Sequence, residues 1–217
     1  MYTPINTKRN THYGSNYWEA YSPKLKRSVH MYSDLEYDDW VLIETDPNVS
    51  DFCEQPVKIK RFYDGRYAES IIDMWVKYRD NTEQFLEIKY SNELDVNNPK
   101  SLRTLKQIRI QQDWCSENGY KHIVRTEKEI RSNPVYLENM KQLLPYLRED
   151  GSTNELDKKR VLNFISNERY SISNIAEYLE SISKQRILAV ILNLIYRGEI
   201  HSNVANVPIS DKLEVWV

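Results

Sequence analysis

The sequence predicts an α/β fold: one helix, three antiparallel strands, a second helix and a fourth strand, followed by a mainly helical C-terminal domain. Three observations predict it. Three short runs between residues 57 and 90 have the composition of strands and are separated by turn residues. Two longer segments, one before and one after these runs, begin and end with residues that are typical of helix ends. They cover residues 33–45 and 101–118. Past residue 132, helical patterns replace the strand patterns.

The first domain is expected to cover residues 1–132, and its first half contains a helix and a strand meander. The helix opens at Ser33-Asp-Leu-Glu36 and runs to about Thr45, because Asp46-Pro47 stops it. Turn residues at Asp64-Gly65 and at 79–82 then separate three expected strands, at 57–63, 67–78 and 84–90.

The second half of this domain is expected to contain a long helix and one more strand. The helix covers residues 101–118, and Gly119 stands where a C-terminal helix cap is expected. The strand covers 122–126. The order of elements is therefore αβββαβ.

The second domain is expected to cover residues 133–217 and to be mainly helical. After the four helices, two short strands near 198–202 and 213–217 have the right separation to pair as a wing. Three helices with a terminal hairpin follow the winged-helix plan, which is a relative of the helix-turn-helix. The four expected helices lie at 136–148, 157–166, 172–180 and 184–197.

Composition limits the class of protein. The 217 residues carry a formal net charge of −2, whereas simple DNA-binding domains are usually basic. Acidic residues around a metal site offset basic patches in this count, so the charge does not exclude a nuclease. The apolar runs are too short to span a bilayer, and the N-terminus lacks signal-peptide features, so a cytoplasmic protein with no membrane segment is expected. Cys53 and Cys115 are expected to be free thiols.

The strongest functional signal is Asp73 followed by Glu87-Ile88-Lys89. Side chains in a strand alternate between faces, so Glu87 and Lys89 point the same way, and a hairpin brings Asp73 beside them. Two carboxylates and a lysine form a site for a hard divalent cation, with an ammonium beside the bound water. The competing interpretation is a surface ion pair on an exposed sheet face. Against it, Asp73 lies in an apolar run, where an unpaired carboxylate is costly.

Three further groups of residues are candidates. Glu36 either completes the metal shell or reaches back to the Ser33 amide in a capping box. Gln55, just before the first expected strand, is a candidate DNA contact or a simple turn residue. Three basic residues lie among aromatic residues near the N-terminus, a mixture that suits phosphate and base contact or a solvated arm; they are Lys24, Lys26 and Arg27.

The αβββαβ order that carries Asp73 and Glu87-Ile88-Lys89 resembles the core of the restriction-endonuclease-like, or PD-(D/E)XK, nucleases. A more specific resemblance is to TnsA, the endonuclease subunit of heteromeric, TnsABC-type transposases. Ile72 stands where that family usually has a proline. The resemblance to TnsA rests on Ser33-x-Leu-Glu36, Asp46-Pro47-x-Val49, Glu54-Gln55-Pro56, Ile72-Asp73, Glu87-Ile-Lys89 and Thr126-Glu127-x-Glu129-Ile130.

The resemblance implies a magnesium-dependent DNA endonuclease. Asp73 and Glu87 would bind Mg2+ (or Mn2+ in its place), helped by Glu36 and the Ile88 carbonyl, while Lys89 would act on the water or the phosphate. The partners implied are double-stranded DNA at transposon ends, a TnsB-like DDE transposase and a TnsC-like ATPase. Two alternatives stay open: a restriction or DNA-repair endonuclease of the same fold, and a non-catalytic winged-helix DNA-binding or assembly protein.

Overall fold

The computed structural model describes residues 2–5, 16–63, 65–147, 155–166 and 168–217. The chain divides into two compact units. The first contains residues 1–44 and 48–132, and the second contains residues 133–217 together with Thr45–Pro47. Within the described ranges, no helix is both long enough and apolar enough to cross a membrane.

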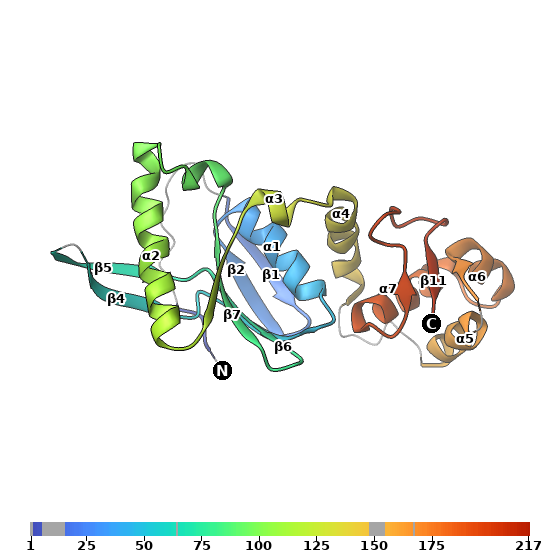
Figure 1. Cartoon of the computed structure of the whole chain (residues 1–217). Helices are drawn as coiled ribbons and strands as arrows, with labels where there is room; N and C mark the ends of the chain where they lie inside the picture. Colours follow the sequence, from blue (N-terminus) through green and yellow to red (C-terminus); the bar gives the residue numbers. More distant parts are fainter. Residues whose placement is uncertain (1, 6–15, 64, 148–154, 167) are drawn as a thin grey trace. The chain divides into compact units, whose positions relative to one another are not determined.

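A four-stranded mixed sheet forms the centre of the first unit (Figure 1). Its strands lie in the order β3 (Val49–Glu54), β6 (Met74–Tyr78), β7 (Glu83–Ile88) and β8 (Lys121–Arg125). The pairs β3–β6 and β6–β7 are antiparallel, and the pair β7–β8 is parallel. With the helices α1 (Asp34–Thr45) and α2 (Leu102–Glu117), the chain order is α1, β3, β6, β7, α2, β8. The two predicted helices and the strands at β6, β7 and β8 are therefore present in the predicted order, in a mixed sheet that is consistent with a nuclease-like fold, whereas the first strand of that sheet was not predicted.

Two of the predicted strands were wrong in detail. The first strand of the central sheet is β3, and the expected strand at 57–63 instead forms β4 (Lys58–Tyr63). The single expected strand at 67–78 is two strands, β5 (Arg66–Ile71) and β6, interrupted at Ile72–Asp73. Strands β4 and β5 pair only with each other, as a two-stranded ribbon inserted between β3 and β6. β3 was missed because Ser50, Asp51 and Glu54 are poor strand formers, and burial in the sheet outweighs that preference.

The ribbon turn contains Gly65, whose φ of 75° is a left-handed conformation that glycine adopts at no steric cost. Asp64, the other residue of the expected turn, lies outside the described residues. A second hairpin, unpredicted from the sequence, consists of β1 (Trp18–Ser22) and β2 (Arg27–Met31). Gly119, at φ 73°, follows α2 as expected of a helix end.

The hydrophobic core between α2 and the sheet follows from strand register. Cys53, Trp75, Phe85 and His122 are partners across the four strands, so their side chains lie in one row on one face. The first three pack against Ile110 of α2. Glu87 lies two residues after Phe85 in β7, so it faces α2 as well. Cys53 and Cys115 are buried free thiols, as predicted.

The short elements of the first unit connect these parts. The 3-10 turns η1 (Ser91–Leu94) and η2 (Pro99–Ser101) lead from β7 to α2, and α3 (Glu127–Ile130) follows β8. Thr126 caps α3 in a capping box with Glu129, which gives this motif of the resemblance a structural role.

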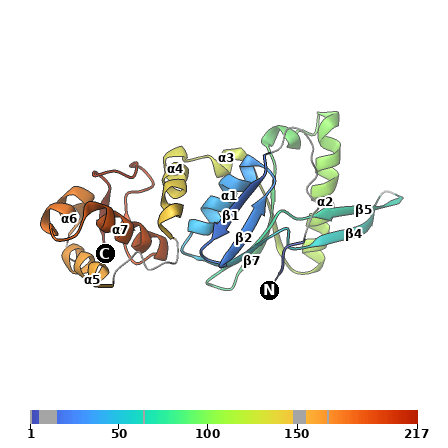
Figure 2. The ribbon, with the colours of Figure 1, turned by 180° about the vertical axis from the view of Figure 1, so that it is seen from behind.

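The second unit is helical with a small three-stranded sheet (Figure 2). The expected helices at 157–166, 172–180 and 184–197 are present, whereas the one at 136–148 stops at Leu143, since Pro145 cannot continue it. Strand β9, between α5 and α6, was not predicted. The elements are α4 (Pro134–Leu143), η3 (Leu144–Leu147), α5 (Glu155–Ile165), β9 (Tyr170–Ser171), α6 (Ile172–Tyr178), α7 (Lys184–Arg197), β10 (His201–Ser202) and β11 (Glu214–Trp216).

Candidate active site

Asp73 lies where the chain leaves the β4–β5 ribbon and enters the central sheet. Its carbonyl oxygen accepts a hydrogen bond from the Gln55 amide at 2.8 Å, and its Oδ2 accepts one from the Ile88 amide, also at 2.8 Å. The first bond fixes the backbone of Asp73 to the end of β3. The second places its carboxylate beside the end of β7. The carboxylate of Asp73 is therefore hydrogen-bonded, although its neighbours in the sequence are apolar.

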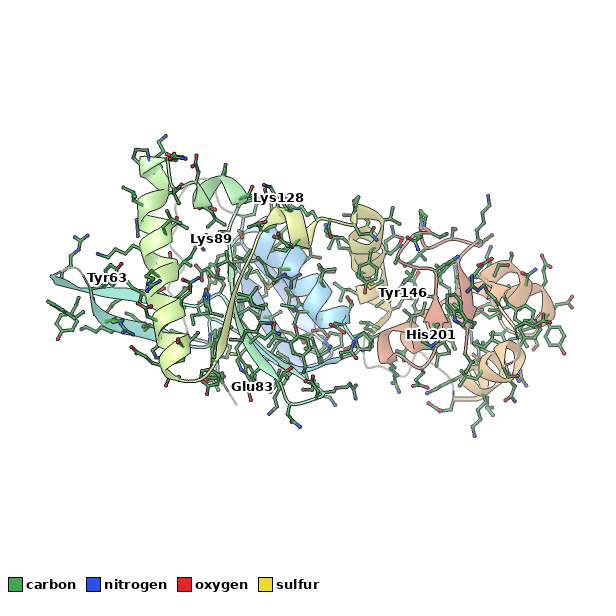
Figure 3. The ribbon with its side chains drawn as sticks, in the orientation of Figure 1. Tyr63, Glu83, Lys89, Lys128, Tyr146 and His201 are labelled. Atoms are coloured by element: carbon green, nitrogen blue, oxygen red, sulfur yellow. The ribbon has the colours of Figure 1, made fainter. Side chains whose placement is uncertain are left out.

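Three oxygen atoms converge on the Lys89 ammonium. Its Nζ lies 2.7 Å from Glu87 Oε1, 3.0 Å from the Ile88 carbonyl oxygen and 3.5 Å from Asp73 Oδ2. Figure 3 labels Lys89 just past the end of β7. The predicted association of Asp73, Glu87 and Lys89 is therefore present, and a single cationic group occupies the point that the three oxygens surround.

Glu87 is fully buried and is held from two sides. Its Oε1 accepts from Gln107 Nε2 at 2.7 Å as well as from Lys89. Its Oε2 accepts from Gln111 Nε2, again at 2.7 Å. Both glutamines come from α2, one helical turn apart, so the same helix face supplies both amides. A buried carboxylate is costly unless it is hydrogen-bonded, and these amides supply the required donors.

The contacts of Gln111 fix the orientation of its amide. The nitrogen faces Glu87 Oε2 and the Ile71 carbonyl, which are both acceptors, so the amide oxygen must face His122. His122 Nε2 lies 3.0 Å from that oxygen and is therefore the donor. Burial lowers the pKa of His122, which favours the neutral ring with its proton on Nε2. His122 thus donates a hydrogen bond to the amide oxygen of Gln111, and the amide nitrogen of Gln111 donates one to Glu87.

The carboxylates at the site carry more negative charge than Lys89 balances. Burial and then the charge of Asp73 raise the pKa of Glu87 to about 8, against the opposing effect of Lys89. The same two causes raise the pKa of Glu36 to about 7. Burial lowers the pKa of Lys89, but Asp73 and Glu87 outweigh it, and the net shift is upward. Three acids against one ammonium form an environment that favours an added cation.

Glu36 caps the first helix, with the Tyr32 amide as its backbone partner in place of the expected Ser33 amide, and its role as a metal ligand stays a prediction. Its carboxylate accepts from the Tyr32 amide at 2.9 Å and from the Ser33 hydroxyl at 3.2 Å, and so caps the start of α1. It also lines a cavity of about 660 Å³ together with Ile88 and Lys89. This cavity therefore reaches the Lys89 end of the site.

The donor chemistry at the site fits magnesium. Within the part of the chain that is described, no three His, Cys, Asp or Glu side chains lie close enough together to hold a metal ion by themselves. The oxygens around Lys89 are two carboxylates and one carbonyl, all hard donors of the kind that Mg2+ prefers. Since an ammonium already occupies their common centre, a metal ion and Lys89 would compete for the same oxygens.

Two of the predicted DNA contacts, Lys24 and Arg27, form hydrogen bonds within the first unit. Lys24 Nζ donates to the carbonyls of Ile43 and Val49. Arg27 forms a two-bonded pair with the buried Glu54, at 2.6 and 2.7 Å.

Two predicted DNA contacts have unusual backbone conformations. Lys26 lies in the turn between β1 and β2 with φ 57°. Gln55 has φ 45°, a conformation that is rare for residues other than glycine, and its amide anchors Asp73. Strained backbone of this kind is common at functional sites, and here it adjoins the predicted ligand.

Sequence reasoning missed the buried amide network. Gln107 and Gln111 belong to the polar side of α2, which from its sequence is expected to be solvated or to line a DNA groove, and the histidines have no mutual spacing that suggests a role for His122. Gln111 is fully buried. The available signal was the spacing of Gln107 and Gln111 among the isoleucines Ile108 and Ile110, which places one amide on the core side.

A comparison with known families agrees with this geometry. Residues 46–127 match the family described as TnsA-like endonuclease N terminal, of the Tn7 TnsA type. The match covers Asp73, Glu87, Lys89 and the amide network, and it begins after Glu36. A search of curated proteins found no match. Residues 46–127, less than half of the chain, therefore form a TnsA-like endonuclease domain, and this match supports a nuclease of the Tn7 TnsA type.

Proposed function

We propose that this chain is a magnesium-dependent DNA endonuclease that cuts the 5′ ends of a transposon. In this proposal it works with a TnsB-like DDE transposase, which processes the 3′ ends, and with a TnsC-like ATPase regulator. One observation carries the proposal: Asp73, Glu87 and the Ile88 carbonyl converge on a single cationic point, inside a domain that matches the TnsA-like endonucleases.

The residues divide the chemistry among them. Asp73, Glu87 and the Ile88 carbonyl would hold Mg2+, with Glu36 at the edge of the same cavity. When bound, the ion lowers the pKa of a water molecule and offsets negative charge on the phosphate. Gln107 and Gln111 keep the Glu87 carboxyl group in position. Lys89, released from these oxygens, donates to the scissile phosphate or orients the attacking water.

The proposed reaction is hydrolysis of a phosphodiester bond. Water adds to phosphorus, the bond from phosphorus to the 3′ oxygen breaks, and that oxygen takes up a proton. The products are a 3′-hydroxyl and a 5′-phosphate.

The second unit is proposed to be a winged-helix domain that docks on DNA or on a protein partner. Its order, α5, β9, α6, α7, β10 and β11, places a short strand between the first two helices and a hairpin after the third. That arrangement is typical of winged helices. The formal net charge of −2 suits a nuclease whose DNA affinity comes partly from partners.

Two measurements separate this proposal from its alternatives. Calorimetric titration with Mn2+ should give binding to the wild-type chain and a large loss of affinity in Asp73→Asn. Equal binding by both would support a non-catalytic protein. Cleavage of transposon-end DNA should then require the TnsB-like and TnsC-like proteins. Site-specific cutting by the chain alone would support a restriction or repair enzyme.

A further inference from the structure

The β4–β5 ribbon has an outer face that the candidate active site does not explain. Figures 1 and 2 both show it extending past α2, away from the central sheet. One face of the ribbon packs on α2: Ile59 is buried, Arg61 pairs with Glu117, and the Tyr63 ring (Figure 3) receives the Lys106 ammonium. These contacts hold β4 against α2 and so fix the orientation of the ribbon relative to that helix.

The outer face combines exposed aromatic rings with lysines. Phe62 and Tyr67 are direct cross-strand partners, 62% and 69% exposed, and their rings meet edge to face at 5.4 Å. The Lys60 ammonium lies 5.4 Å from the centre of the Tyr67 ring. Lys58, on the same face, pairs with Glu69 where both side chains are half exposed. Two large aromatic side chains left in water forgo the stabilisation that burial would provide, which indicates that a partner covers them.

The charge of the ribbon favours nucleic acid as that partner. Residues 58–71 contain four basic residues (Lys58, Lys60, Arg61, Arg66) and two acidic ones (Asp64, Glu69), in a chain that is acidic as a whole. A two-stranded ribbon fits the major groove of B-form DNA, where lysines reach phosphates and apolar side chains contact base edges. A neutral protein surface would not require this local excess of positive charge, and the regular spacing of phosphates on a duplex matches it.

The ribbon is joined directly to the site. β5 ends at Ile71, two residues before Asp73, and Ser70 of β5 accepts a hydrogen bond from Gln111, the residue that holds Glu87. Tyr67 precedes Asp73 by six residues, which corresponds to roughly 20 Å of extended chain. At 3.4 Å per base pair, that distance is about six base pairs of DNA.

We propose that the β4–β5 ribbon is a duplex-DNA clamp, which contacts the major groove about six base pairs from the cut phosphate through Lys60, Phe62 and Tyr67. This inference rests on the proposed nuclease function. It assigns a duplex contact to the ribbon in addition to the predicted contacts of Lys24 and Arg27, which pair internally in this structure.

Photo-crosslinking tests the contact with the full chain. Tyr67→Cys would be labelled with a photoactivatable thiol reagent and mixed with a DNA duplex of about four helical turns. The native thiols Cys53 and Cys115 are 1% and 0% exposed, so the new cysteine is the reactive one. The matched control is Lys121→Cys, an exposed position at the end of β8 opposite the site. Crosslinking from position 67 and little from position 121 is expected. Equal or absent crosslinking overturns the proposal.

Binding measurements supply the second readout. Lys60→Ala should reduce the salt dependence of duplex binding by about 0.9 in the slope of log Kd against log salt, one phosphate contact. Phe62→Ala should weaken binding about fivefold with the slope unchanged. Lys121→Ala should change neither quantity. Ribbon variants that bind like wild type overturn the proposal.

The outcomes also separate the clamp from the nuclease assignment. A chain that crosslinks through position 67 but never cuts DNA retains the clamp and loses the nuclease function. A chain that cuts DNA while its ribbon variants bind and crosslink normally retains the function and loses the clamp. If the ribbon variants bind duplex normally but fail only in the presence of protein partners, the ribbon serves a protein instead, and the proposal is wrong.

Discussion

Gln111 of α2 donates from Nε2 to Glu87 Oε2 at 2.7 Å, and both side chains are fully buried. The bond links the helix that covers the sheet to Glu87, the acid that we propose as a metal ligand. Because His122 and the Ile71 carbonyl fix the amide orientation, Gln111 presents a donor and not its oxygen to Glu87. The position of the proposed metal ligand is therefore set by residues that do not themselves contact the metal or substrate.

Substitution of Gln111 should weaken metal binding without removing a ligand. Gln111→Ala leaves Glu87 Oε2 without this donor, and loss of such a supporting contact reduces metal affinity about 10- to 100-fold. Mn2+ titration calorimetry measures it. The matched control is Gln112→Ala, the exposed neighbour in the same helix, which should bind Mn2+ like wild type. Equal affinities in the two variants would show that Gln111 has no positioning role.

Substitution of Lys89 should separate metal binding from cleavage. Its ammonium contacts the same three oxygens that would hold the ion, so Lys89→Ala removes a competitor and should bind Mn2+ at least as tightly as wild type. Cleavage should be lost, because no ammonium remains to act on the phosphate. Lys77→Ala, which removes a lysine from β6, is the control and should retain cleavage. A Lys89→Ala variant that binds Mn2+ more than about tenfold weaker would contradict this account.

Stability should depend on pH through Asp39. This fully buried acid of α1 lies 2.7 Å from Arg125 Nη1. Burial raises its pKa to about 6, against the lowering effect of Arg125. Because the folded pKa exceeds the unfolded one, the stabilisation is complete below the unfolded pKa and is lost as pH rises through the folded pKa. From about pH 5 to about pH 7.5, Asp39 should therefore lower the free energy of unfolding by about 1.4 kcal/mol.

Urea denaturation followed by tryptophan fluorescence measures this effect. Four of the five tryptophans (Trp18, Trp40, Trp75 and Trp114) lie in the first unit, so the signal reports mainly on it. The comparison is with Asp39→Asn, in which this component of the pH dependence should disappear. The same pH dependence in both proteins would show that Asp39 ionises normally in the folded state.

Arg27 should contribute to stability through its internal pair. Its guanidinium forms two hydrogen bonds to Glu54, whose side chain is 4% exposed. Arg27→Ala leaves that acid without its partner and should cost roughly 2 kcal/mol, a figure reduced for the partial exposure of Arg27. Lys58→Ala, which breaks an exposed pair with Glu69, should cost less than about 0.5 kcal/mol. Similar losses of unfolding free energy in the two variants would rule out a special role for the Arg27 pair.

The sequence contained enough information for the two helices, for the last strands of the central sheet and for the association of Asp73, Glu87 and Lys89. Helix ends at Asp46-Pro47 and Gly119 are local signals, and the alternation of Glu87 and Lys89 follows from strand geometry alone. The position of Asp73 between two strands could not be predicted, because the apolar run around it looks like one continuous strand. Nothing in that run indicates that strand pairing changes at Ile72. β5 pairs with β4, whereas β6 pairs with β3 and β7, and these pairings are long-range.

The buried amide network was hidden for a different reason. A glutamine in an amphipathic helix usually faces water, and only the strand register shows that Glu87 and His122 face Gln111. Likewise, Arg27 looked like a phosphate contact because its acidic partner, Glu54, is 27 residues away. In both cases the deciding partner is distant in sequence, and no local pattern identifies it.

The most direct test of the central claim is the mapping of cleaved transposon ends. With Mg2+ and the TnsB-like and TnsC-like proteins present, the wild-type chain should cut the 5′ ends and leave 3′-hydroxyl and 5′-phosphate termini. Asp73→Asn should abolish this cut while the partner transposase still processes the 3′ ends. Cutting of the 5′ ends by Asp73→Asn at the wild-type rate would contradict the assignment of the nuclease site.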